Sequence, residues 1–343
     1  KPALRTLNLP ASPRWSRMAL QTHISPFKLE ISILKYIIQA QMNIAEHNFL
    51  ESNLYLYCAK YALEKAPWKS VKDVRLFFIL QLTRLLDLSK IKLIAWLNSF
   101  HACLVSKFAL YFFKILQRIE KESKANTDDH GQLLSGNDMM KALNLKSLEH
   151  NFLIYIDQFF SRGDCFYMGL VFEAHNLKHP DLTGYECPVD DEELWPYPLT
   201  GMRSWPAIFS FPNVGRKKRH LTNEQEEYPQ EHWPNIISLI QDNQEELLRF
   251  DRFDALYYFD QKLNTSYVIA KVEKRMSVVL LYKKKVKKGD SSIHDVLGLF
   301  TQSLRNVKIL EKLRQFSIVD LHTPCWGDDK FRGRPSSPDR KST

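Results

Sequence analysis

The segment from Lys90 to Lys121 constrains the fold of this chain most, because large apolar residues lie on almost every side of it. Their spacing of three and four predicts one long helix. Its main apolar stripe consists of Leu93, Leu97, Phe100, Leu104, Phe108, Tyr111, Ile115 and Ile119. Apolar residues off that stripe include Trp96, Cys103, Leu110, Phe112 and Phe113. Such a helix must be enclosed. We expect its cover to be a helix from a missing N-terminal region or another protein.

Hydropathy alone would also allow this segment to be a membrane span. However, Asn98, His101 and Lys107 interrupt it, and polar residues are unfavourable within a bilayer. We therefore predict a buried helix with some apolar side chains left for a partner. The candidates for partner contact here are Trp96, Phe100, Phe112 and Phe113.

Two further helices are predicted before this segment. The first begins at Ser25-Pro26, a capping residue followed by proline, and runs to about Leu63. Its apolar stripe is Phe27, Ile31, Leu34, Ile38, Met42, Ala45 and Phe49. The second begins near Ser70, and its apolar side holds Val71, Val74, Phe78, Leu82 and Leu85. These helices and the long apolar one predict an incomplete helical bundle.

The order of elements predicts two domains, one all-α and one α+β. Residues 1–25 are predicted to be a loose lead-in, 26–122 the helical bundle, 123–146 a polar linker, 147–318 the α+β domain and 319–343 a disordered tail. The second domain is predicted to hold a five-stranded sheet flanked by helices. Its predicted helices are Leu148–Arg162, Asp251–Leu263 and Ser291–Arg305. Three of its predicted strands are Cys165–Ala174, Thr265–Val272 and Met276–Tyr282.

The other two predicted strands each follow a Trp-Pro pair. These pairs are Trp205-Pro206, in "WPAIFSF", and Trp233-Pro234, in "HWPNIISLI". Proline favours an extended residue before it and can start a strand. A tryptophan at strand entry either closes the end of the sheet or anchors a partner. Trp205 and Trp233 are therefore also candidates for partner contact.

Motifs for catalysis or cofactor binding are not found. The five cysteines contain no CxxC pair, which favours a reducing, intracellular compartment over a disulfide framework. There is no glycine-rich phosphate loop, HExxH motif or nucleophile elbow. His175 and His179, with Asp181 and Cys187 beyond, are the nearest approach to a metal site, but they lead into a proline-rich stretch. We predict no enzyme activity, no cofactor and no metal.

Two basic runs contribute much of the formal charge of +9. The first contains Arg216, Lys217, Lys218 and Arg219, and the second begins with Lys283, Lys284 and Lys285. A solvated loop is one interpretation of each run. The alternative is contact with nucleic acid or an anionic membrane. That second possibility defines a different class of function, a basic-patch binding protein.

Five stretches, in this order, resemble the KICSTOR subunit 2 family over residues 24–318. They are "ISPFKLEISILKYIIQAQMNIAEHNFL" at Ile24–Leu50, "WLNSFHACLVSKFALYFFKIL" at Trp96–Leu116, "WPAIFSFP", "HWPNIISLI" and "YYFDQKLNTSYVIAKVEKRMSVVLLY". Members of that family carry a substantial helical region before the point where the match begins. The chain starts with Lys1 rather than Met, so we expect either a fragment or a gene model without its true start, and in both cases the absence of this region.

The resemblance implies a non-enzymatic adaptor. The family's complex would tether the GATOR assembly, which activates the Rag GTPases' hydrolysis, to the cytosolic face of the lysosome. It would thereby restrain TOR signalling when nutrients are scarce. The implied partners are kaptin, an FG-GAP-repeat protein and a very large scaffold subunit, and through them GATOR. Association with the membrane would then be indirect.

Overall fold

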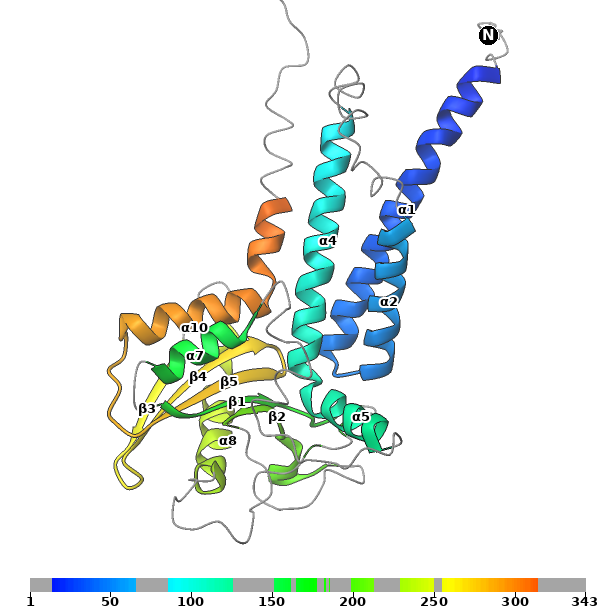
Figure 1. Cartoon of the computed structure of the whole chain (residues 1–343). Helices are drawn as coiled ribbons and strands as arrows, with labels where there is room; N and C mark the ends of the chain where they lie inside the picture. The colour runs from blue at the N-terminus through cyan, green and yellow to red at the C-terminus, as the bar shows by residue number, and fades with distance from the viewer. Residues whose placement is uncertain are drawn as a thin grey trace, which may run out of the picture.

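The computed structural model describes residues 14–65, 86–125, 151–161, 165–177, 182, 185, 199–212, 229–249 and 255–313. Helices form the N-terminal half, and a five-stranded antiparallel sheet with helices on both faces forms the rest (Figure 1). This confirms the predicted fold class. The basic run at 216–219, the helix predicted around Val71–Leu85 and the tail after 318 lie outside the described residues.

The first predicted helix is in fact two. α1 (Arg14–Ala45) and α2 (Phe49–Lys65) form an antiparallel hairpin. The chain reverses at His47, whose φ of 56° is left-handed and therefore incompatible with a continuous right-handed helix. α1 also begins at Arg14, inside the segment predicted to be a loose lead-in.

The buried face of α1 differs from the predicted one. Ile33, Ile37, Ala40 and Ile44 are fully buried, whereas Ile31, Ile38 and Met42 are exposed. The first set steps by four, three and four and the second by seven and four, so both follow helical spacing and the sequence carries two apolar stripes on one helix. The predicted stripe therefore mixes exposed residues with Leu34, which packs against the core, and Phe49, which is buried.

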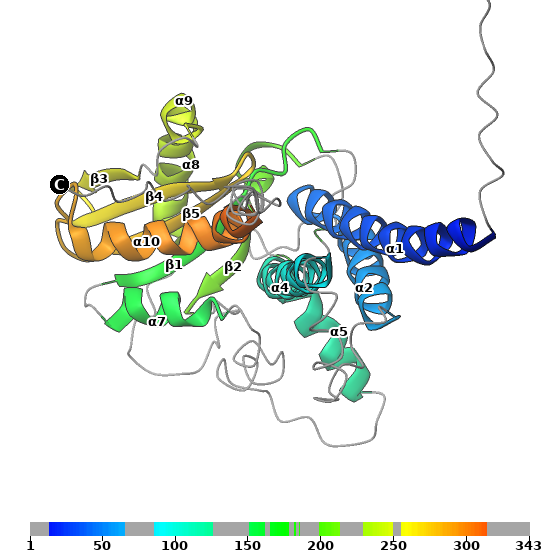
Figure 2. The ribbon, with the colours of Figure 1, turned by 90° about the horizontal axis from the view of Figure 1, so that it is seen from above.

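The long apolar segment also divides. α4 (Leu86–Tyr111) ends near Phe112, and α5 (Phe113–Ala125) leaves it at a steep angle (Figure 1). α4 is long and apolar enough to cross a membrane by length and composition. A core helix passes the same test, and α4 is packed between the hairpin and the sheet (Figure 2).

The sheet has the strand order β2-β1-β5-β4-β3, with every neighbouring pair antiparallel. Its strands are β1 (Cys165–Phe172), β2 (Ala207–Phe211), β3 (Leu256–Asp260), β4 (Thr265–Glu273) and β5 (Met276–Tyr282). Four of these confirm predicted strands. The fifth, β3, occupies part of a predicted helix, while the segment after Trp233-Pro234 is a helix rather than a strand.

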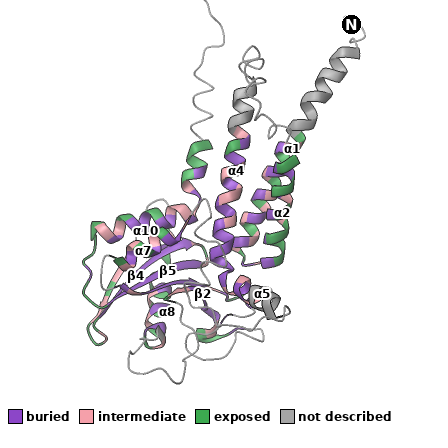
Figure 3. Ribbon diagram, in the orientation of Figure 1, coloured by how far each residue is buried: buried purple, intermediate pink, exposed green. Residues whose placement is uncertain are grey.

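Alternation along the central strands gives the sheet two buried faces. Val268 and Ala270 of β4 face a core formed with α7 (Leu153–Ser161) and α10 (Ser291–Leu304), both predicted helices. Tyr267 and Ile269 face a second core formed with α8 (Trp233–Asp242) and α9 (Gln244–Leu247). Buried strands therefore lie between two helical layers (Figure 3).

The helical half and the sheet share one hydrophobic core. It runs without interruption from Ile33 of α1 through Leu104 of α4 to Val268 of β4 and Phe300 of α10. The predicted helical domain and the predicted α+β domain therefore do not have separate cores, because one buried cluster extends through both. This continuity holds the hairpin and the sheet in a fixed relation.

Candidate interaction surface

The aromatic residues predicted to face a partner are interior residues of this chain. Each of the six is at most 6 % exposed: Trp96, Phe100, Phe112, Phe113, Trp205 and Trp233. They contribute to the packing of the fold and offer no surface to another protein. The prediction of partner contact through these side chains is therefore wrong.

The cover of α4 comes from its own chain. Between Leu93 and Phe113, Ala95 is the one exposed residue. The Trp96 indole N–H donates to the carbonyl of Ile309, beyond α10, at 2.7 Å. No external helix is needed to enclose the described part of α4, so that expectation is wrong as well. The sequence pattern correctly demanded an enclosure but could not say which segment supplies it.

The two Trp-Pro pairs meet in the core beneath α8. The Trp233 indole N–H donates to the carbonyl oxygen of Trp205 at 3.2 Å. Pro234 lies in the first turn of α8, where a missing N–H costs nothing. The first pair therefore precedes β2 and the second opens a helix. Both tryptophans are buried in the core between the sheet and α8, so each has a structural role in this chain.

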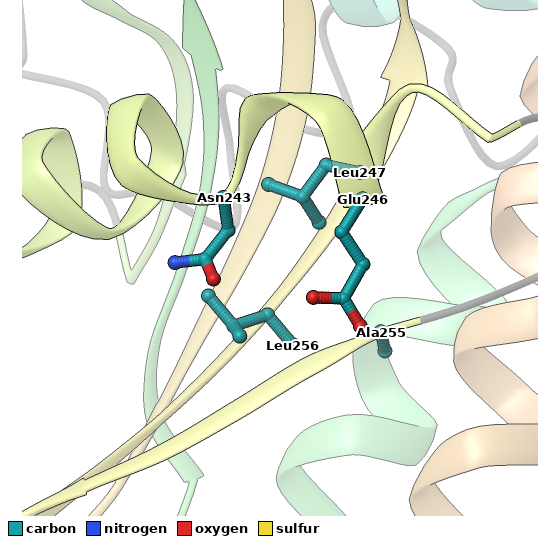
Figure 4. A pocket seen from close by; sticks show the side chains of 5 residues that line it. All are labelled: Asn243, Glu246, Leu247, Ala255 and Leu256. Carbon is teal, nitrogen blue, oxygen red and sulfur yellow. The ribbon is translucent and has the colours of Figure 1, made fainter.

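Chemistry of the catalytic or metal-binding kind finds no support among the described residues. None of them form a group of three or more His, Cys, Asp or Glu suited to a metal. His175 is exposed, and His179, Asp181 and Cys187 lie outside the described residues. The pocket between α9 and β3 has an empty volume of about 180 Å³, including open solvent (Figure 4). Small-molecule sites typically enclose about 300–1,000 Å³.

Exposed apolar side chains instead gather on the outer side of the α1–α2 hairpin. We call this set the hairpin face. Its members are Ile31, Ile38, Met42, Leu50, Leu54, Tyr57 and Tyr61. They account for half of the large apolar residues that are exposed in the described part of the chain. A concentration of this kind is typical of a protein-interaction site.

The α2 part of the hairpin face is the more apolar. Leu50, Leu54, Tyr57 and Tyr61 follow one another at intervals of four, three and four, and each is between 50 % and 69 % exposed. This spacing is the one with which helices pack against helices. The rings of Tyr57 and Tyr61 are stacked at 6.5 Å, and the Lys65 ammonium lies 4.1 Å from the Tyr61 ring centroid. α2 therefore presents an ordered apolar ridge.

The α1 part alternates apolar and basic residues. Lys28, Ile31, Lys35, Ile38 and Met42 share its exposed side at intervals of three and four. Tyr36 stacks on Tyr55 of α2 with a centroid distance of 6.5 Å, which joins the two helices. A helix from a partner would meet apolar side chains here with ammonium groups between them.

The base of the hairpin is anchored by His47. Its imidazole is fully buried between three aromatic rings, with centroid distances of 4.6 Å to Phe112, 4.9 Å to Phe172 and 5.4 Å to Tyr185. Neither ring nitrogen has a hydrogen-bond partner among the described residues. Burial without a partner lowers the pKa of His47 to about 3. The turn is thus held by a neutral imidazole.

Polar contacts fix the same hairpin to the sheet. Glu273, at the end of β4, forms an ion pair with the buried Lys107 of α4. The Gln41 side chain of α1 donates to Glu273 at 3.5 Å and accepts from Asn306 at 3.0 Å. Four distant segments, α1, α4, β4 and the chain after α10, therefore meet at one partly buried network that connects the hairpin to the sheet.

Most of the hairpin face was absent from the sequence prediction. The signal was present, because α2 alone carries apolar residues on two sides. The interpretation of Ser25–Leu63 as one helix with one apolar stripe concealed this signal.

Three of the predicted basic contacts, Lys283, Lys284 and Lys285, are exposed in the loop after β5. The predicted contacts at 216–219 lie outside the described residues.

Together, these observations define a mixed α and β protein whose helical hairpin carries exposed apolar residues. A family model described as "KICSTOR complex C12orf66 like" matches residues 10–317. The chain belongs to this family, which confirms the resemblance.

Curated relatives agree with that assignment. KICSTOR subunit 2 of Xenopus laevis is 26% identical over 318 residues, covering 90% of this chain and 62% of that protein. KICSTOR subunit 2 of Danio rerio is 25% identical over 306 residues, covering 88% and 60% respectively. The chain thus spans about three-fifths of the length of these relatives.

Proposed function

We propose that this chain is a non-enzymatic adaptor subunit that assembles into a KICSTOR complex. The family match over residues 10–317 is the observation that carries the proposal. The relatives are named as numbered subunits of that complex, which means that they work in association with other chains. The partners proposed here are kaptin, the FG-GAP-repeat protein and the large scaffold subunit.

The finer part of the proposal concerns signalling. The complex would tether the GATOR assembly at the cytosolic face of the lysosome and so restrain TOR signalling in nutrient shortage. Support comes only from family membership. Its test is the response of TOR-dependent phosphorylation to amino-acid withdrawal in cells that lack this chain. Persistent phosphorylation, restored to normal by re-expression, is expected; a normal response without the chain contradicts the signalling role.

The hairpin face is the surface proposed for assembly. It is exposed and apolar, and Leu54 and Tyr57 lie near its centre on α2. Burial of two such side chains in an interface contributes several kcal/mol, at about 1.5–3 kcal/mol each. Introducing charge there should therefore weaken assembly strongly.

The corresponding experiment is co-purification with the three named partners. L54D/Y57D is expected to reduce their recovery at least about tenfold, since a loss of about 1.4 kcal/mol already gives that factor. The matched control is I154D/L299D, which changes two exposed apolar residues on α7 and α10. Wild-type recovery with L54D/Y57D assigns assembly to another surface. Failure of the wild-type chain to recover any of the three contradicts the adaptor role itself.

A further inference from the structure

The loop between β5 and α10 concentrates positive charge at the end of the molecule remote from the hairpin face (Figures 1 and 2). Its five lysines fall within six residues, and all five are exposed: Lys283, Lys284, Lys285, Lys287 and Lys288. We call this segment the lysine loop. Between them, Val286 is buried and ties the loop to the core.

The lysine loop is a built structure rather than a loose connection. The buried Ser266 hydroxyl donates to the Lys284 carbonyl at 2.7 Å and accepts from the Val286 N–H at 2.9 Å. A turn follows, closed by the Asp290 N–H donating to the Lys287 carbonyl at 3.1 Å. Gly289 in that turn has a φ of 82°, which glycine adopts without strain. The backbone that carries the lysines is therefore held in place by hydrogen bonds.

Two of these lysines lie against aromatic rings. The Lys283 ammonium is 5.6 Å from the Phe166 ring centroid, and the Lys285 ammonium is 5.6 Å from the Phe259 centroid. The start of α10 does not add an anion site, because the Asp290 carboxylate already accepts from the Ser292 N–H at 3.1 Å. The attraction for an anionic partner thus comes from the lysines themselves.

We propose that the lysine loop binds the surface of an anionic phospholipid membrane. A short cluster of lysines is drawn to such a surface by its potential, and each ammonium adds to the attraction. Membrane contact would then be direct, whichever proteins the hairpin face binds. The inference is independent of the adaptor role, because it depends on the purified chain alone.

Nucleic acid fits the same loop less well. The loop contains lysine and no arginine, and lysine is a point charge without the two-pronged geometry that reads a base edge. Single strands are usually held by open aromatic faces on which bases stack. Here the two neighbouring rings, Phe166 and Phe259, each have an ammonium group placed over them.

The test is sedimentation of the purified full chain with vesicles. Wild-type protein is expected to sediment with vesicles of phosphatidylcholine plus phosphatidylserine and not with vesicles of phosphatidylcholine alone. Binding should weaken as salt rises from about 0.1 M to about 1 M, because the Debye length falls from about 10 Å to about 3 Å. Inorganic phosphate should displace the protein no better than chloride at equal ionic strength.

The variant K284A/K287A/K288A spares the two lysines that cover rings and is expected to weaken vesicle binding about 100-fold. The control K28A/K35A/K60A removes the same charge from exposed positions on α1 and α2 and should change binding less than about threefold. Equal loss in both variants, no loss in the first, or equal binding to neutral vesicles overturns the proposal. Tighter binding to a single-stranded oligonucleotide, lost with the same variant, overturns it in favour of nucleic acid.

Discussion

His47 shows how one buried side chain can make the whole fold sensitive to acid. Its unfolded-state pKa is about 6.5 and its folded-state pKa is about 3. Between these values the unfolded chain binds a proton that the folded chain does not. The favourable contribution of neutral His47 is therefore fully present above about pH 6.5 and is lost as pH falls toward 3. The loss approaches about 1.4 kcal/mol per pH unit.

Replacing His47 with Phe keeps a ring among Phe112, Phe172 and Tyr185 but removes the titrating nitrogens. We expect H47F to flatten the dependence of unfolding free energy on pH between about 6 and 4, by up to about 1.4 kcal/mol per unit. Urea unfolding at a series of pH values measures this. The exposed His175, changed to Gln, is the control. An unchanged slope in H47F would show that another group governs acid stability.

The ion pair of Lys107 and Glu273 connects two elements, because it joins α4 to the end of β4. Lys107 is fully buried and Glu273 is 15 % exposed. Removing one member of a buried pair leaves an uncompensated charge and typically costs about 3–5 kcal/mol. K107M should therefore be strongly destabilised.

The double variant K107M/E273M gives the sharper comparison. Removing both charges leaves no buried unpaired ion, so we expect it to recover much of the stability lost in K107M. Chemical denaturation of the wild type, both single variants and the double variant completes the cycle. Additive losses would mean that the two groups do not interact in the folded protein.

Prediction of the elements succeeded where local pattern and environment agree. β4 and β5 are rich in β-branched and apolar residues, and the predicted strands match both to within a residue. α8 was predicted as a strand because its Trp-Pro pair echoes the one before β2. Trp233, Ile236, Ile237 and Ile240, however, share one helical face. In β3, the apolar residues of "LYYFD" were assigned to a helix, although Tyr and Phe favour strands.

Prediction of the interaction surface failed for a different reason. Apolar residues have the same helical spacing whether their face of the helix packs against the core or is exposed to solvent. Only the arrangement of the neighbouring elements determines which face is buried. From the sequence, Trp96 and Phe100 are candidates for surface anchors. In the structure, Trp96 hydrogen-bonds to Ile309, and both side chains are buried in the core that the hairpin shares. Ile38 is predicted to be a core residue, but it is exposed in the structure, and the neighbouring Ile37 is buried instead.

At the scale of the whole molecule, the shared core predicts that the helical half and the sheet unfold together. Leu104 is fully buried in α4, and the cluster that contains it continues to Val268 in β4.

The substitution L104A should lower the free energy of unfolding by about 2–5 kcal/mol. Because the core is common, amide hydrogens of β4 and of α4 should lose protection by the same free energy in hydrogen-exchange measurements. Two independent domains would give a different result, with faster exchange in α4 and unchanged exchange in β4. A single calorimetric transition that moves as a whole in L104A supports one cooperative unit that includes both the helical half and the sheet.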